Sequence, residues 1–208
     1  MAKPFLTDEA KRALSEAVTA VEAVSSAELV IAVRPRSGSY LHADLIAATG
    51  AALATLLVLL FSPWTFELVW FVIDPVLAGI LAGALAARWP ALRRLLTSPA
   101  VRRRQVEVLA RSLFLEKGVH KTRGRTGILV YLSLLEREAE VVVDAGVEPL
   151  LSTESWQREV REIRAAVRRG EDGVAVATRL HELALLLGAA LVRAEDDVDE
   201  LSNEVTDR

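Results

Sequence analysis

The feature that most constrains the fold of this chain is a pair of long apolar runs near its centre. The first run extends from Leu45 to Phe61 and the second from Leu68 to Ala87. At a rise of about 1.5 Å per residue, helices of this length cross most or all of a hydrocarbon layer about 30 Å thick. Apolar residues occupy every side of these helices rather than one stripe. We therefore predict a transmembrane helical hairpin over residues 43–89.

The alternative is a buried pair of antiparallel helices inside a soluble protein. A chain of 208 residues has little other mass with which to cover two uniformly apolar helices. A secretory signal peptide is also disfavoured, because the first run begins near residue 45, behind a segment with the pattern of an amphipathic helix. Membrane insertion is the favoured interpretation.

Small and polar residues in the second run indicate how it packs and where it begins. Gly79 and Gly83 form a GxxxG pair, which predicts close helix packing and a contact between copies of the chain. Asp74 directly precedes Pro75, the order of an N-cap followed by a first-turn proline, so we predict a structural role for Asp74 at the helix start. An ion or proton site at Asp74 is the alternative.

Basic residues are concentrated directly after the second run. Residues 88–125 hold eleven Lys and Arg side chains and two Glu, a net charge of +9. Because Lys and Arg accumulate beside membrane helices on the cytoplasmic side, both flanks and both termini are predicted to be cytoplasmic, in the inner membrane of a bacterium. These cations also suit anionic headgroups, with a substrate anion as the alternative. The anion- and lipid-binding candidates are Arg102, Arg103, Arg104, Lys121, Arg123 and Arg125.

The remainder of the chain has the pattern of an α/β domain. Apolar periodicity and turn residues predict helices and strands at residues 7–24 (helix), 28–33 (strand), 101–117 (helix), 126–133 and 140–144 (strands), and 155–169 and 174–192 (helices). Because isolated strands are only marginally stable, we expect the three strands to join in one small sheet with helices packed on it.

The hairpin therefore interrupts a single domain. Residues 1–38 and residues 97–192 are predicted to form the two parts of this α/β domain. Residues 193–208 are acidic and poor in apolar side chains, so we predict a flexible, solvated tail, with a docking role as the alternative.

Recognisable catalytic signals are sparse in this sequence. The absence of cysteine excludes disulfides and thiolate zinc sites, and no GxSxG, HExxH or Walker motif is present. No nucleic-acid partner is predicted, because the basic segment lacks a reader motif and an aromatic platform. Glu28 opens an apolar strand, where a buried carboxylate needs a partner. We predict a structural ion pair between Glu28 and an arginine near Arg123.

Acidic residues of the predicted strand pair provide candidates for metal binding. Asp144 and Glu148 lie near Gly146, which ends the second strand of the pair, and carboxylates at such a position suit calcium or magnesium. The alternation of Glu136, Glu138 and Glu140 is equally typical of the solvent face of a hairpin, which is the favoured interpretation of the acidic set, with Asp144 and Glu148 as the pair to test for a metal.

Several short segments outside the hairpin form a combined pattern. They are Ser26–Val33 behind an amphipathic helix, Leu113-Phe114 with Gly118, Arg125–Ser133 with Gly127, Glu136, Val141–Val143 and Asp144-Ala145-Gly146. This pattern resembles the TPM domain family, especially its bacterial membrane members with two spans inserted after the first strand, and it covers residues 7–34 and 100–190. The resemblance implies a small α/β sandwich in which Gly127 and Gly146 are structural. The family includes a thylakoid-lumen member described as an acid phosphatase and linked to photosystem repair, auxiliary factors of membrane complexes, and members that bind calcium.

The sequence departs from the family pattern at its acidic positions. The basic loop His120–Arg125 replaces an acidic segment of soluble members, and only Glu148 and Glu154, with Asp144, match the family's acidic positions, which makes these three the metal candidates. The favoured function is a membrane-anchored, non-catalytic interaction, assembly or regulatory module with a membrane-protein partner. The alternatives are a phosphatase-like hydrolase dependent on calcium or magnesium, and a small channel or transporter built around Asp74.

Overall fold

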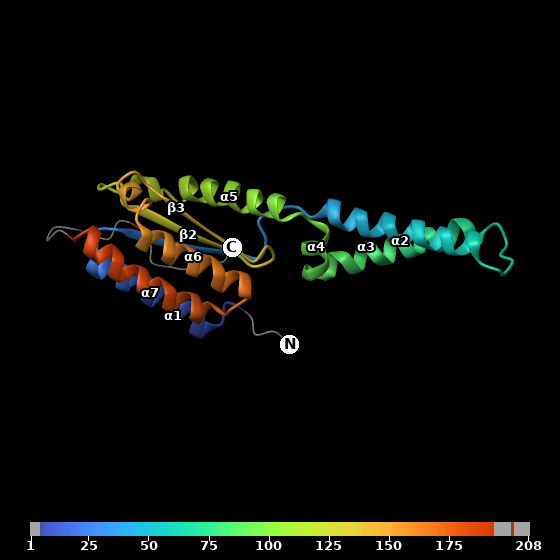
Figure 1. Cartoon of the computed structure of the whole chain (residues 1–208), viewed down its shortest axis with the longest axis horizontal. Coiled ribbons are helices and arrows are strands. Elements are labelled where there is room, and N and C mark those ends of the chain that lie inside the picture. Colours follow the sequence, from blue (N-terminus) through green and yellow to red (C-terminus); the bar gives the residue numbers. More distant parts are fainter. Residues whose placement is uncertain (1–4, 194–200, 202–208) are drawn as a thin grey trace. The chain divides into compact units, whose positions relative to one another are not determined.

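The computed structural model describes residues 5–193 and Leu201 (Figure 1). The chain divides into two compact units, and each is described by itself. The first comprises Met1–Ser37 and Arg103–Arg208, and the second comprises Gly38–Arg102.

The first unit is built on a three-stranded sheet in the order β1-β2-β3. Strand β1 (Glu28–Arg34) pairs in parallel with β2 (Gly127–Ser133), and β2 pairs antiparallel with β3 (Glu138–Val143). All seven residues of β2 are buried, because the central strand is covered on both faces. The expected single sheet is confirmed, and with it the mixed α/β fold.

Helices cover both faces of this sheet. Helices α1 (Asp8–Val24), α6 (Glu154–Arg169) and α7 (Gly173–Ala190) share one apolar cluster with the sheet side chains Leu29, Ile31, Ile128 and Val130. Helix α5 (Pro99–Glu116) and the short 3₁₀ helix η1 (Val119–Lys121) pack on the other face, against Val30, Leu129 and Tyr131. A second 3₁₀ helix, η2 (Glu148–Leu150), follows β3. The alternation of side chains along each strand thus supplies two cores.

Side-chain caps determine where three of these helices begin. Thr7 Oγ1 accepts a hydrogen bond from Ala10 N (3.1 Å), and Thr153 Oγ1 accepts one from Trp156 N (3.3 Å). Asp172 Oδ1 accepts from Ala175 N (3.1 Å) at the start of α7. Such caps satisfy backbone donors that have no partner inside the helix and contribute about 1 kcal/mol each.

The second unit contains α2 (Leu41–Phe61), α3 (Trp70–Arg88) and the short α4 (Pro90–Leu96). Helices α2 and α3 pack along one another through small residues. A Cβ atom added to Gly79 would lie 3.1 Å from the Ala48 carbonyl oxygen, and one added to Gly83 would lie 3.3 Å from Ala48 Cβ. The GxxxG face predicted to join two copies of the chain is therefore occupied by α2 of the same chain.

The predicted N-cap role of Asp74 is wrong. Helix α3 begins one turn earlier, at Trp70, so both Asp74 and Pro75 lie inside it. The turn at Glu67 and Leu68 starts the helix, with Trp70 N donating to Glu67 O (3.0 Å) and Phe71 N to Leu68 O (3.2 Å). Pro75 is tolerated because it sits near the helix start and removes a single intrahelical donor.

An ion pair joins the start of α2 to α4. Arg93 donates to both carboxylate oxygens of Asp44, from Nε to Oδ1 (2.9 Å) and from Nη2 to Oδ2 (2.6 Å), and both side chains are largely shielded from water. His42 Nε2 and Thr97 Oγ1 form a further hydrogen bond of 3.1 Å beside it. Arg93 belongs to the basic segment of the sequence, but its charge is matched inside the unit.

Three helices are long and apolar enough to cross a membrane, judged by length and composition. In the most apolar window of each, 6% of the residues are buried in α2, 11% in α3 and 39% in α7. Helix α7 contributes Val176, Leu180, Leu183 and Leu187 to the core of the first unit. It therefore differs from α2 and α3, because its apolar face lies in the core of the α/β unit.

The tail predicted at residues 193–208 lies outside the described residues except at Arg193 and Leu201. Arg193 Nη1 donates to Glu22 O (2.8 Å), and the half-buried Leu201 packs against the cluster under α5. At these two positions the chain is in contact with the domain rather than solvated.

Candidate functional site

The basic loop between η1 and β2 is held in a defined conformation. Arg125 adopts a left-handed backbone (φ 54°), unusual for a residue other than glycine. Its N–H donates to Thr122 O (3.1 Å), and its carbonyl oxygen accepts from Gly146 N (2.8 Å). The loop is thus tied to the segment that follows β3.

The side chain of Arg125 binds Asp144 through two parallel hydrogen bonds. Arg125 Nε donates to Oδ2 (2.8 Å) and Nη2 donates to Oδ1 (2.7 Å), which is the favoured geometry of a guanidinium with a carboxylate. Asp144 Oδ1 also accepts from Ala145 N (2.8 Å). A residue predicted to bind anions and one predicted to bind a metal are therefore partners of each other.

The environment of Asp144 favours its charged form. The carboxylate is 5% exposed, and its burial acts to raise its pKa. The hydrogen bonds from Arg125 and Ala145, together with the positive charges of Arg125 and His120, outweigh burial and lower the pKa of Asp144 below its ordinary value. Asp144 is thus held ionised by a guanidinium.

Two glycines permit this arrangement. A Cβ atom on Gly146 would lie 2.6 Å from Gly124 O and 2.7 Å from Arg125 O, where no side chain fits. A Cβ atom on Gly127 would lie 2.0 Å from Val119 O. Any other residue at these two positions would force the backbone of the basic loop away from the sheet.

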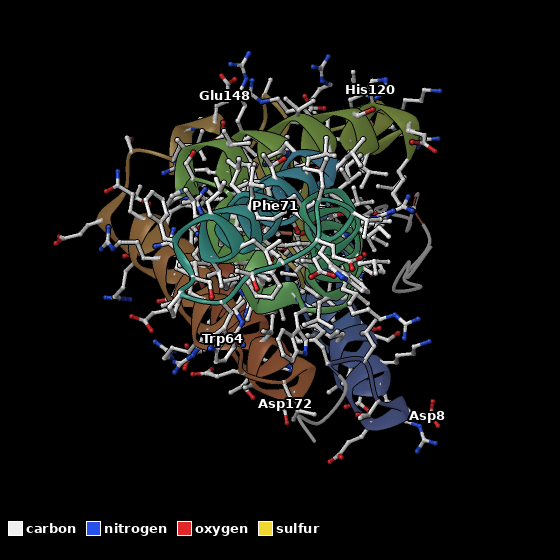
Figure 2. All side chains as sticks on the ribbon, turned by 90° about the vertical axis from the view of Figure 1, so that its right-hand side faces the viewer. Asp8, Trp64, Phe71, His120, Glu148 and Asp172 are labelled. Carbon is white, nitrogen blue, oxygen red and sulfur yellow. The ribbon has the colours of Figure 1, made fainter. Side chains whose placement is uncertain are left out.

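The three metal candidates do not form a metal site. Glu148 and Glu154 are exposed, at the first positions of η2 and α6 (Figure 2 labels Glu148), and Glu154 suits the positive end of its helix. Asp144 is buried and bound to Arg125. Among residues 5–193 and Leu201, no three His, Asp or Glu side chains are placed to hold a metal ion.

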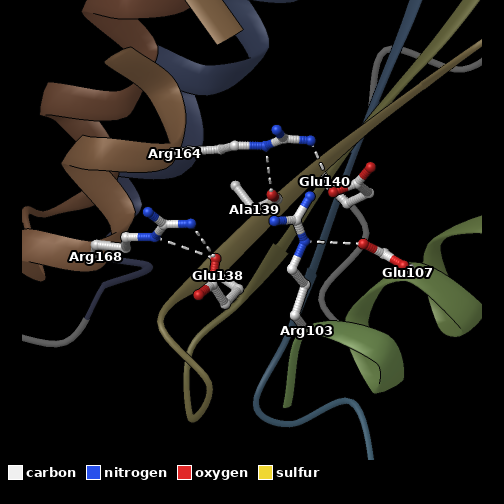
Figure 3. Close-up of polar contacts among 7 residues, drawn as sticks. All are labelled: Arg103, Glu107, Glu138, Ala139, Glu140, Arg164 and Arg168. Atoms are coloured by element: carbon white, nitrogen blue, oxygen red, sulfur yellow. Dashed lines mark hydrogen bonds and ion pairs between the residues drawn. The ribbon is translucent and has the colours of Figure 1, made fainter. Parts of the chain in front are cut away.

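Two glutamates of β3 bind arginines of α6 rather than facing solvent alone (Figure 3). Arg164 Nη2 donates to Glu140 Oε2 (2.9 Å), and Arg164 Nε donates to the carbonyl oxygen of Ala139 (3.3 Å). Arg168 Nε and Nη2 donate to Glu138 Oε2 (3.3 and 3.1 Å). Because β3 is an edge strand, these side chains cover a backbone edge that is otherwise open to another strand.

A further lipid-binding candidate belongs to the same charged cluster. Arg103 Nε donates to Glu107 Oε1 (2.9 Å), one turn away on α5, and faces Glu138 and Glu140 (Figure 3). Burial raises the pKa of Glu140, Arg164 and Arg103 oppose the rise, and the neighbouring Glu107 adds to it. The charge of Arg103 is thus directed to carboxylates of the domain.

The other anion-binding candidates are placed differently. Arg102 is half-buried, whereas Arg104, Lys121 and Arg123 are exposed. Of the six predicted candidates, Arg103 and Arg125 thus form ion pairs within the domain, and Arg104 and Lys121 are exposed.

A buried polar network at the end of β2 was not anticipated from the sequence. Ser37 Oγ donates to Ser133 Oγ (2.7 Å), and Ser133 Oγ donates to Glu136 Oε2. Ser37 N donates to Glu136 Oε1 (2.7 Å). Because the Ser37 hydroxyl hydrogen is already used, the 2.8 Å contact with Tyr131 OH makes the tyrosine the donor. The expected solvent position of Glu136 is wrong, since it is 1% exposed.

The serine and the tyrosine that β2 contributes to this network are closed to a substrate. A serine beside a carboxylate is one element of nucleophilic catalysis, but Ser133 and Tyr131 are 0% exposed. Burial raises the pKa of Tyr131, which keeps the phenol protonated and able to donate. The network satisfies buried polar groups where the chain leaves the sheet. The signal that could have revealed it is the placement of Tyr and Ser within an otherwise apolar strand.

Glu28 is buried at the start of β1, where its N–H donates to Thr126 O (3.3 Å). The predicted ion pair of Glu28 with an arginine near Arg123 stays a prediction.

Comparisons with known proteins support the fold. No family model matches the chain, and a search of curated proteins found no match. The chain is similar to the NMR structure of the BA42 protein from the psychrophilic bacterium Bizionia argentinensis, with a TM-score of 0.59 and 14% sequence identity over 100% of this chain and 99% of that one. At this identity the likeness concerns the fold.

The Arg125–Asp144 pair predicts a pH-dependent stability. The folded pKa of Asp144 lies below its unfolded value of about 3.9, so the pair stabilises the fold above that pH and is lost as pH falls through the folded pKa. Asp144→Asn should lower the melting temperature at pH 7, and the difference from the unaltered protein should narrow below about pH 4. Melting followed by circular dichroism between pH 7 and 3 measures this.

Glu148→Gln is the matched control, because Glu148 is exposed and close in sequence. It should leave the melting temperature unchanged across the same range. Equal stability of Asp144→Asn and the unaltered protein at pH 7 would contradict the role of the pair.

Proposed function

We propose that this chain is a membrane-anchored α/β module of the TPM type that acts as a non-catalytic interaction, assembly or regulatory factor at the cytoplasmic face of a bacterial inner membrane. The observation that carries the proposal is the apolar surface of α2 and α3. Both helices are long enough to cross a membrane, and few of their residues are buried. Lipid is the environment in which such a surface is stable.

The size of the uncovered surface supports lipid over water. Burying one large apolar side chain is worth about 1.5 to 3 kcal/mol, and many such side chains are exposed on these two helices. Those on α2 are Leu41, Leu45, Ile46, Leu53, Leu57, Val58, Leu60 and Phe61, and those on α3 include Val72, Val76, Leu77, Ile80, Leu81 and Leu85.

The proposal has two spans rather than three. Helix α7 has a suitable length and composition, but its apolar face fills the core of the α/β unit. Withdrawing α7 into lipid would remove Leu180, Leu183 and Leu187 from that core, each at a cost of about 2 to 5 kcal/mol if the space is left empty. Its place is therefore in the domain.

The residues at the two ends of the hairpin support its orientation. Trp64 and Phe66, in the connection between α2 and α3, are exposed aromatics of the kind found at membrane interfaces (Figure 2 labels Trp64). At the other end of α3 lie the exposed Arg88 and Trp89. The basic end is proposed to face the cytoplasm and its anionic headgroups.

The non-catalytic part of the proposal rests on how the charged side chains are used. Asp144 is bound by Arg125, and the glutamates of β3 are bound by arginines of α6. The remaining metal candidates, Glu148 and Glu154, are exposed, and among the described residues no three His, Asp or Glu side chains are placed to hold a metal ion. Exposed side chains of α5 and the basic loop remain as contacts for lipid or a membrane-protein partner.

Cysteine labelling tests the orientation. The chain contains no cysteine, so single-cysteine variants need no background substitution. Trp64→Cys in spheroplasts should react with a membrane-impermeant maleimide, because the hairpin tip faces outward. Ser152→Cys, at an exposed position of the α/β unit, should react after permeabilisation and not before. The reverse pattern would contradict the proposed topology.

Purification of the full chain in a mild detergent tests the interaction function. The protein should elute in a complex of fixed composition with a membrane protein, and Arg104→Glu together with Lys121→Glu should reduce recovery if the exposed cations make the contact. Glu16→Gln on α1 is the control substitution. A chain recovered strictly alone would count against the proposal.

The same purified protein distinguishes the proposed function from the alternative, a metal-dependent phosphatase. Release of phosphate from p-nitrophenyl phosphate should not depend on calcium, magnesium or manganese. Metal-dependent turnover that disappears in Glu148→Gln would establish the hydrolase and overturn the non-catalytic assignment.

A further inference from the structure

A cavity of about 450 Å³ lies in the α/β unit, between the β2–β3 turn and the connection from α6 to α7. This size falls within the range of small-molecule sites, about 300 to 1,000 Å³. One wall is apolar and consists of Phe5, Leu134 and Val167. The chain before α1 is held there by a hydrogen bond from Gly173 N to Phe5 O (3.2 Å).

Arg137 is the one cation that lines the described part of this cavity. It makes no hydrogen bond or ion pair with another described residue, unlike its counterparts Arg125, Arg164 and Arg168, which bind carboxylates. Its Cζ, Nη2 and Nε atoms lie 3.4, 3.6 and 3.7 Å from the position of a Cβ atom on Gly170. The guanidinium therefore lies beside Gly170, on the side where a Cβ atom would point.

The backbone of Arg137 is in an unfavourable conformation. Its φ of 52° lies in the left-handed region, where a hairpin turn favours glycine or asparagine. Gly170, beneath the guanidinium, is also left-handed (φ 75°) and ends α6. Arg137 is exposed, its backbone is strained, and its guanidinium has no hydrogen-bond or ion-pair partner among the described residues, so it can bind a ligand in this cavity.

Two carboxylates complete the cavity. Glu171 Oε1 accepts from Arg169 Nε (2.6 Å), and Asp172 Oδ1 accepts from Ala175 N (3.1 Å). Each carboxylate has a second oxygen for which no protein partner is recorded among the described residues. Figure 2 labels Asp172 at the start of α7. The lining thus offers a cation, two anions and an apolar wall.

We infer that this cavity binds a small zwitterion with an apolar side chain, of the chemical class of a free aliphatic or aromatic α-amino acid. The ligand carboxylate accepts from the N–H edge of Arg137, and its ammonium donates to the open oxygens of Glu171 and Asp172. The side chain packs on Phe5, Leu134 and Val167. A simple anion fits less well because the two neighbouring carboxylates repel it, and a simple cation leaves the Arg137 guanidinium without a partner.

Calorimetric titration of the full chain in lipid nanodiscs with L-leucine tests the inference. Saturable binding is expected. Arg137→Asn should weaken the affinity by about 10- to 100-fold, because that is the contribution of a charge-assisted hydrogen bond to binding. Asparagine suits the left-handed backbone, so this variant should keep its fold. Arg161→Gln, at an exposed position of α6 away from the cavity, is the matched control and should bind as the unaltered chain does.

Two analogues of L-leucine test the contacts of its ammonium and of its carboxylate separately. N-acetyl-L-leucine lacks the ammonium and L-leucinamide lacks the carboxylate, and each should bind at least about 10-fold more weakly than L-leucine. Failure of L-leucine to bind, or equal binding by Arg137→Asn, would overturn the inference. An analogue that binds as tightly as L-leucine would overturn the zwitterion assignment.

Discussion

The structure depends on where apolar surface can be buried. The α/β unit has two filled cores, one on each face of a three-stranded sheet, and the side chains that fill them come from α1, α5, α6 and α7. The hairpin helices α2 and α3 cover each other along one line of small residues, where Gly79 faces Ala48 and Ala52. Their remaining surface is apolar and exposed. A bilayer would cover this surface, and the proposed membrane anchoring follows from that imbalance.

The basic side chains also have several different roles. The sequence suggested one basic segment with one role, but the structure assigns its members to different tasks. Arg93 binds Asp44 within the hairpin unit, whereas Arg103 and Arg125 pair with carboxylates of the domain. Arg104 and Lys121 are exposed. Fewer residues than the net charge implied are therefore available for the proposed contact with headgroups or a partner.

The fold was predictable from the sequence because its signals are local. Apolar runs, strand patterns and turn glycines indicated the two long helices, the strand pair and the order of elements. Of the elements in residues 5–193, α4 and the two 3₁₀ helices were not predicted. The error at Asp74 arose because Asp-Pro is compatible both with a helix start and with a position one turn inside it.

The side-chain partnerships were not predictable, because they join residues far apart in the sequence. Asp144 was assigned to a metal on its local context, yet its partner Arg125 lies on the other side of two strands. Ser37 and Glu136 are nearly one hundred residues apart and meet because β1 and β2 are neighbours. Arg137 was not predicted as a site residue, because neither its left-handed backbone nor the cavity beside it can be recognised from the sequence pattern.

The central claim is that α2 and α3 lie in lipid while α7, despite its composition, lies in the domain. Spin labels on Leu57→Cys and Leu185→Cys, both exposed apolar positions, compare these helices directly in nanodiscs. Power saturation should show Leu57 accessible to oxygen and shielded from a water-soluble nickel chelate, and Leu185 accessible to the chelate. Chelate access at Leu57 equal to that at Leu185, or shielding at both positions, would contradict the account.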